Sequence, residues 1–112
     1  MNLSDEQFEF LKDVSIIIDL VIRQGYRVTF GEAYRTPEQQ EIYFRTGKTK
    51  TMNSYHLKRL AIDLNFFEGD NYLTSKEALQ SIGDYWENLN DKNSWGGNWQ
   101  SFTDTPHFER RV

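Results

Sequence analysis

The stretch of sequence that decides the fold is residues 54–67, which read SYHLKRLAIDLNFF. From Leu60 to Phe66 every second residue is apolar, and the residues between them are alanine, aspartate and asparagine. Successive side chains of a strand point to opposite faces, so one face here is apolar and the other is small or polar. The pattern predicts a strand over residues 60–67 that buries one face and presents Asp63 on the other.

Three helices are expected around this strand, each opened by a capping residue and its partner three positions later. The first spans residues 4–24, with Ser4 as its cap and Phe8 at the head of an apolar repeat of helical period. The second opens at Thr36 and the third at Thr74. The apolar residues on the first and third helices predict a buried face on each.

Short strands complete the expected fold. Residues 26–30 alternate in the period of a strand, residues 68–73 form a turn and the second arm of a hairpin, and residues 107–110 are the last strand. Strands and helices are mixed rather than strictly alternating, which favours an α+β fold over a doubly wound sheet. No repeat or linker interrupts the 112 residues, so we expect one domain, residues 1–112.

Composition excludes several classes of function. The chain has 13 Lys and Arg against 17 Asp and Glu, a net charge of -4 and no cysteine. The lack of cysteine excludes disulfides, a thiol nucleophile and zinc held by thiolates, and the negative balance argues against nucleic acid as a partner. No apolar run approaches the ~20 residues of a membrane span, so no membrane insertion is expected. Acids stand near the first residue where a signal peptide carries bases, so we expect synthesis in the cytoplasm without a signal peptide.

Each of the two histidines of the chain has an aspartate close to it in the sequence, so that the two side chains can belong to one site. Asp63 follows His56 by seven residues, and Asp104 precedes His107 by three. Each has a plain alternative: a lone histidine is more often a surface or core residue, and Asp104 can be a turn former. Asp63 stands in an apolar run, where a carboxylate needs an arginine, a metal or several donors.

Together these residues suit zinc chemistry. Since seven is odd, His56 and Asp63 cannot share one face of a regular strand, so His56 comes from the loop before it. With His107 they make three ligands for Zn²⁺ and leave the fourth position to water, as in catalytic zinc sites. Asp104 is then the candidate base, although a fourth ligand at Asp104 would make a closed structural site. Ala61 would leave empty space beside the ion.

These residues lie in ordered motifs. Residues 54–63 contain Ser-x-His and Ala-x-Asp, residues 95–109 read WGGNWQSFTDTPHFE, and residues 34–40 read YRTPEQQ. The chain resembles the family of zinc D-Ala-D-Ala carboxypeptidases, D-Ala-D-Ala dipeptidases and phage L-alanyl-D-glutamate endopeptidases. The resemblance implies a small antiparallel sheet with helices packed on it, in the hedgehog-like fold of these peptidases. It implies that His56, Asp63 and His107 bind Zn²⁺, that Asp104 is the general base, and that Arg35 polarises the scissile carbonyl or holds a substrate carboxylate. For Ser54 it implies either a substrate contact or a hydroxyl that supports a metal ligand. Glu109 is the next candidate for the base.

Two positions near the motifs carry separate expectations. Arg59 stands where many members of the family have glycine, and its side chain either alters the pocket or points into solvent. Trp95 and Trp99 flank two glycines, and we expect them as a pocket wall beside His107, with Trp95 in contact with substrate.

The favoured function is a zinc peptidase that cuts peptidoglycan stem peptides between L-Ala and D-Glu, acting as a monomer on the bacterial cell wall. Cleavage at D-Ala-D-Ala by a carboxypeptidase or dipeptidase is the alternative within the family. A different class is a non-catalytic zinc- or wall-binding module, or a nucleic-acid binder that uses the bases of residues 45–59. The net charge of -4 and the presence of Asp104 weigh against both. These bases are either a solvated loop or attract the carboxylates of wall peptides.

Overall fold

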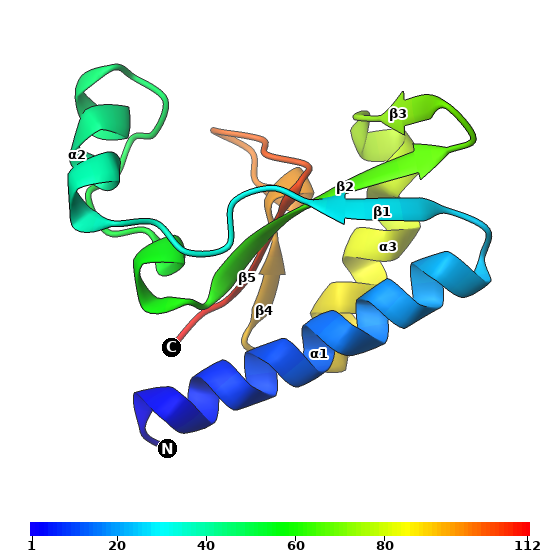
Figure 1. Cartoon of the computed structure of the whole chain (residues 1–112), viewed down its shortest axis with the longest axis horizontal. Helices are drawn as coiled ribbons and strands as arrows, with labels where there is room; N and C mark the ends of the chain where they lie inside the picture. The colour runs from blue at the N-terminus through cyan, green and yellow to red at the C-terminus, as the bar shows by residue number, and fades with distance from the viewer.

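A computed structural model describes all 112 residues. The elements in chain order are α1 (Leu3–Arg23), β1 (Arg27–Phe30), α2 (Pro37–Arg45), the 3-10 turn η1 (Tyr55–Lys58), β2 (Ala61–Glu68), β3 (Asn71–Leu73), α3 (Lys76–Leu89), β4 (Asn93–Trp95), the 3-10 turn η2 (Gly96–Asn98) and β5 (His107–Arg110). Helix α2 lies apart from the other two helices, at one end of the molecule (Figure 1). None of the helices combines the length and hydropathy that crossing a membrane would require.

The strands form an antiparallel sheet in the order β1-β2-β5-β4, with β3 paired to β2 in a hairpin. Strand β2 is central because β1, β3 and β5 all pair with it. Its register with β5 sets Asp63 opposite His107 and Ala61 opposite Glu109. Directly opposed residues of an antiparallel pair have Cβ atoms about 4.5–5.5 Å apart on one face. The sheet therefore brings together two residues that are far apart in the sequence.

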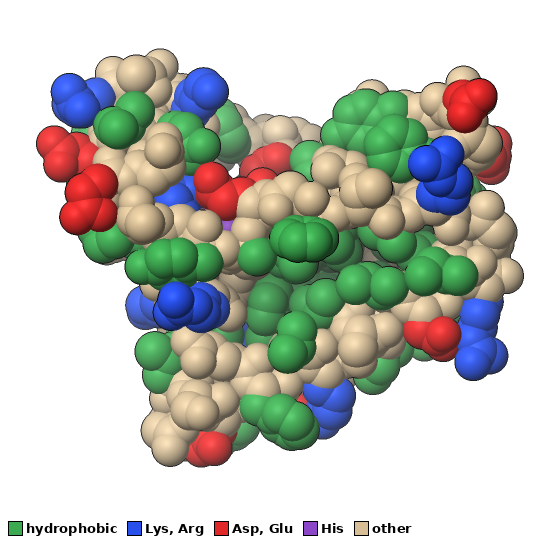
Figure 2. Space-filling model, in the orientation of Figure 1, with side chains coloured by type: hydrophobic (Ala, Val, Ile, Leu, Met, Phe, Trp, Pro, Cys, Tyr) green, Lys and Arg blue, Asp and Glu red, His purple; other side chains and the backbone are tan.

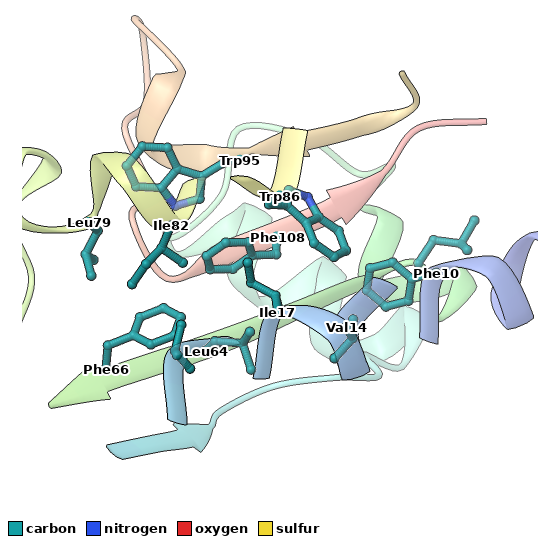
Figure 3. Close-up of a cluster of buried hydrophobic side chains, with 12 residues drawn as sticks. Phe10, Val14, Ile17, Leu64, Phe66, Leu79, Ile82, Trp86, Trp95 and Phe108 are labelled. Carbon is teal, nitrogen blue, oxygen red and sulfur yellow. The ribbon is translucent and has the colours of Figure 1, made fainter. Parts of the chain in front are cut away.

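The core fills the space between the sheet and the helices α1 and α3 (Figure 3). Its twelve buried side chains are Phe10, Val14, Ile17, Val21, Leu60, Leu64, Phe66, Leu79, Ile82, Trp86, Trp95 and Phe108. The expected α+β class is confirmed, with the strand around Asp63, the hairpin after it and the final strand in their predicted places.

Two of the three predicted helix starts are wrong by one or two residues. Helix α1 is capped by Asn2, whose side chain accepts from the Asp5 amide while the Asp5 carboxylate accepts from the Asn2 amide. Helix α3 is capped by Ser75 rather than Thr74, whereas Thr36 caps α2 as expected. Neighbouring capping residues offer equivalent hydrogen bonds, so sequence alone does not choose between them.

The buried face of α1 also differs from the expected one. Phe8 is 65% exposed, and the buried face instead includes Phe10 and two acids, Glu6 and Asp13. Glu6 accepts from Arg110 of β5 at 3.2 Å, and Asp13 accepts from an asparagine side chain at 3.0 Å. An apolar repeat cannot reveal a face that buries paired acids, because such residues count as polar in the pattern.

Candidate metal centre and active-site cleft

Three side chains from different elements converge at one point of the molecule. His56 comes from η1, Asp63 from β2 and His107 from β5. Oδ1 of Asp63 lies 3.4 Å from Nε2 of His56 and 3.6 Å from Nδ1 of His107. One ligand atom from each residue lies within 4.8 Å of the others, a separation that one metal ion can bridge.

The turn η1 fixes the direction of His56. The Ser54 hydroxyl accepts from the His56 amide at 3.2 Å and caps the turn. Nδ1 of the His56 ring lies 3.4 Å from the carbonyl oxygen of Ala33, to which it donates when it carries the hydrogen. That tautomer leaves Nε2 with its lone pair facing Asp63. Ser54 therefore positions a histidine, in addition to lining the cleft described below.

The electrostatics of the three residues favour a bound cation. Burial raises the pKa of Asp63, but contacts with His107 and His56 outweigh it and bring this pKa to about 2. Burial lowers the pKa of His107, yet Asp63 and Glu109 raise it to about 9. In the metal-free protein His107 is thus protonated. Its positive charge balances the negative charges of the Asp63 and Glu109 carboxylates. Two imidazoles and one carboxylate are also a common ligand set for zinc, so the residues fit the metal.

Asp104 lies beside this group without joining it. Its Oδ2 is 3.9 Å from Nδ1 of His107, and its side chain is 36% exposed. Burial raises the pKa of Asp104, and the charge of Asp63 adds to the rise against the opposing effect of His107. A carboxylate in this position can accept a proton from a water molecule near the three ligand atoms.

Gly96 determines where the Asp104 main chain runs. The Asp104 amide donates to the Gly96 carbonyl at 2.9 Å, and a Cβ added to Gly96 would lie 2.2 Å from the Asp104 carbonyl oxygen. The His107 amide in turn donates to that same Asp104 oxygen at 3.1 Å. The glycine of the motif is therefore needed for close approach of two chain segments.

The expected role of Trp95 as a substrate contact is wrong, because this side chain is fully buried in the core. Its indole lies against Gly83 of α3 and against Gly97, where an added Cβ would come within 2.0 and 2.1 Å of ring atoms. Its N–H donates to the Thr105 carbonyl at 2.8 Å. From its place in the core, Trp95 therefore fixes the main chain of the residue that follows Asp104. Trp99 is the tryptophan beside His107, with ring centroids 4.9 Å apart.

Arg35 reaches the site from the segment before α2. Its guanidinium donates to Glu32 through Nε and to Gln40 Oε1 through Nη1 at 2.8 Å, and it lies over the ring of Tyr43. Gln40 is fully buried and also donates to the Thr51 carbonyl at 2.6 Å. These contacts fix the guanidinium while leaving other N–H groups of Arg35 available to a ligand. Glu32 lies outside the quoted motifs, and Gln40, although it ends the segment 34–40, has no role that the sequence predicts.

Arg59 does not reach the site, so its side chain does not alter the pocket. It ends η1 in the left-handed conformation, with φ 57°, and its guanidinium lies 4.1 Å from the ring centroid of Tyr34. Left-handed ends of helical turns favour glycine, so Arg59 occupies a backbone conformation that glycine adopts more easily. The arginine itself is absent from the cleft lining.

A cleft of about 420 Å³ is lined by two of the three residues, His56 and His107, and only two of its thirteen lining residues are hydrophobic. The lining includes three cations, Arg35, Lys48 and Arg111, and two acids, Asp104 and Glu109, together with Trp99. The space-filling view shows a hollow beside the lobe that carries α2, with charged side chains at its base (Figure 2). Ala61 is buried and is not part of the lining. A polar cleft with several cations suits a peptide that carries carboxylates.

Comparisons with known proteins agree with this arrangement. The sequence profile of the D-alanyl-D-alanine carboxypeptidase family matches residues 47–110. The L-alanyl-D-glutamate peptidase of Listeria phage A118 is 30% identical over 103 residues, which cover 83% of this chain and 34% of that protein. The chain thus spans about a third of the length of this curated relative.

A solved structure shares the fold. The L-Ala D-Glu endopeptidase ChiX of Serratia marcescens superposes with a TM-score of 0.69 at 23% identity, over 88% of this chain and 78% of the other. The profile match covers more than half of the chain and includes the segments of all three converging residues. The resemblance in the sequence motifs is therefore confirmed, and the chain belongs to the D-alanyl-D-alanine carboxypeptidase family.

Proposed function

We propose that the protein is a zinc-dependent peptidase that hydrolyses the bond between L-Ala and D-Glu in the stem peptides of peptidoglycan. The observation that carries the proposal is the convergence of three ligand atoms within 4.8 Å beside a polar cleft, with Asp104 at its edge. A structural zinc site would have four protein ligands, whereas three ligands and a neighbouring carboxylate are the arrangement of a catalytic one.

His56 Nε2, Asp63 Oδ1 and His107 Nδ1 would hold the ion. Zinc bound there supplies Lewis acidity and lowers the pKa of a coordinated water. Asp104 accepts the proton of the attacking water, a task suited by its raised pKa, and delivers it to the leaving amine.

Arg35 donates to the scissile carbonyl or to a substrate carboxylate from its fixed position between Glu32 and Gln40. Ser54, which lines the cleft next to His56, contacts the substrate. All of these residues come from one chain, so a monomer suffices for the reaction.

The choice of bond rests on the relatives and on the charge of the cleft. Both the phage relative and the solved structure are named for L-Ala–D-Glu cleavage. A D-Glu residue linked through its side chain carries a free carboxylate beside the scissile bond, and Arg35, Lys48 and Arg111 line the cleft. The family description itself favours a second candidate, removal of the terminal D-Ala. In either case the substrate lies in the bacterial cell wall.

Digestion of purified peptidoglycan tests both candidates at once. The zinc-loaded protein should generate new N-terminal D-Glu and C-terminal L-Ala residues by mass spectrometry, whereas released D-Ala would identify the carboxypeptidase. EDTA should abolish the reaction and added Zn²⁺ should restore it. His107→Ala serves as the inactive control. Peptidoglycan left intact by the zinc-loaded protein would contradict the proposal.

A further inference from the structure

The ring nitrogen of His107 that faces away from Asp63 meets a buried carboxylate. Nε2 lies 2.6 Å from Oε1 of Glu109, a residue that is only 5% exposed. The two residues are two positions apart on β5, so their side chains leave the same face of the sheet. An ionised carboxylate only accepts hydrogen bonds, so Nε2 carries the hydrogen. In the neutral ring, Nδ1 is then the nitrogen with a free lone pair, and it faces Asp63.

Other parts of the chain hold Glu109 in this position. Arg111 donates through Nε to its second carboxylate oxygen at 2.7 Å. Ala61, the cross-strand partner of Glu109, is 1% exposed. The alanine of the Ala-x-Asp motif thus lies directly opposite Glu109 and adds little bulk on that face of the sheet.

The two histidines differ in what supports them. The far nitrogen of His56 faces a neutral backbone carbonyl at 3.4 Å, whereas that of His107 faces a charged carboxylate at 2.6 Å. A carboxylate behind a ligating imidazole fixes its tautomer and raises its basicity. His107 should consequently be the more strongly supported ligand of the pair.

We propose that Glu109 is a positioning residue of the metal centre, which orients His107 with Nδ1 toward Asp63 and strengthens it as a ligand. Glu109 is therefore not a spare general base, because its carboxylate is engaged by His107 and Arg111 on the side away from Asp63. The inference rests on the proposed zinc site, since it concerns affinity for that ion.

The test compares zinc affinities by chelator competition in the parent, Glu109→Gln and Glu109→Met. Glu109→Met removes the acceptor while keeping the size of the side chain, and should weaken zinc binding about 10–100-fold. Glu109→Gln keeps an acceptor oxygen without the charge and should lose less. With Co²⁺ in place of zinc, the visible absorption of Glu109→Met should also change, because the ring of a ligand is no longer fixed. The control is Glu6→Gln, which removes another buried, ion-paired carboxylate and should leave zinc affinity within about twofold of the parent.

The possible results separate this inference from the proposed function. A parent that binds zinc and a Glu109→Met variant that binds it equally well would overturn the role of Glu109 alone. The same conclusion follows if Glu6→Gln weakens zinc binding as much as Glu109→Met, since the effect would then be one of general stability. A parent that binds no zinc would overturn both proposals.

Discussion

The two walls of the cleft are built differently. The sheet wall, made of β5 and the segment from Gly96 to Asp104, is held by the pairing of β5 with β2 and by the core beneath it. The loop wall, residues 46–54, contains no regular element and its backbone bonds run mostly to the end of α2. The proposed base Asp104 and the proposed metal ligand His107 lie on the sheet wall, with Asp63 paired opposite His107, whereas Lys48 lies on the loop wall.

Because the two walls differ in rigidity, we expect the sheet wall to carry the catalytic groups and the loop wall to select the substrate. Catalytic groups must keep their geometry within fractions of an ångström, which a packed sheet provides. A surface loop changes its residues at little cost to the core and is suited to selecting substrates. Substitutions on the sheet wall should therefore cost more activity than substitutions on the loop wall.

The largest effect is expected from Asp104→Asn. If this residue accepts the proton of the attacking water, turnover should fall by about two to four orders of magnitude, the usual scale for a positioned general base. Zinc affinity should stay at the parental level, because the ligands are elsewhere. Calorimetric titration with Zn²⁺ and the rate on a soluble stem peptide measure the two quantities.

His107→Ala is the matched comparison for that experiment. It should lose the metal as well as the activity. If Asp104→Asn binds zinc poorly, or keeps near-parental turnover, the base is not Asp104.

Much of this sheet wall was accessible from the sequence. Asp63 was identifiable because a carboxylate interrupts an apolar alternation, and the order of the motifs placed both histidines with it. The strand pattern also predicts β2 and β5. The pairing register of β2 and β5, which sets Asp63 opposite His107, cannot be predicted in this way. It depends on long-range strand pairing that local patterns do not encode.

The errors have a common physical origin. Trp95 and Trp99 flank the same two glycines, and only the presence of Gly83 on α3 makes room for one of them in the core. Gln40 looks like an ordinary helix residue, yet it is fully buried between Arg35 and the loop wall. Such roles arise from the space that distant elements leave, which sequence periodicity cannot show.

The second expected effect concerns Gly96 on the sheet wall. Gly96→Ala should lower turnover by about 100-fold, because a new Cβ would push the Asp104 main chain away and small displacements of catalytic groups cost this much. Zinc affinity should change less than turnover. The control is Ser101→Ala, which changes an exposed residue of the same segment. Equal turnover in the two variants would show that the close approach is unimportant.

A third prediction concerns the charge of the sheet wall. The pKa of His107 is about 9 in the metal-free protein, above its ordinary value of 6.5, so the ring is protonated at neutral pH. Zinc must displace this proton, and its apparent affinity should rise about tenfold per pH unit between pH 7 and 9. The rise should level off above the pKa. Titrations in buffers of different ionisation enthalpy would count the released proton, and an affinity independent of pH in this range would contradict the expectation.

The smallest effect is expected on the loop wall, from Lys48→Gln. Lys48 lines the cleft, whereas Lys58 lies over the ring of Tyr55 and outside the cleft lining. An exposed charge contributes about 0.2–1 kcal/mol to such contacts, so kcat/KM on an anionic stem peptide should fall by roughly 1.4- to fivefold at low salt. High salt should remove the difference, because it screens exposed charges. Lys58→Gln makes the same change of charge and should behave as the parent does. If Lys48→Gln and Lys58→Gln behave alike at both salt concentrations, the loop wall does not attract substrate and its bases are simply solvated.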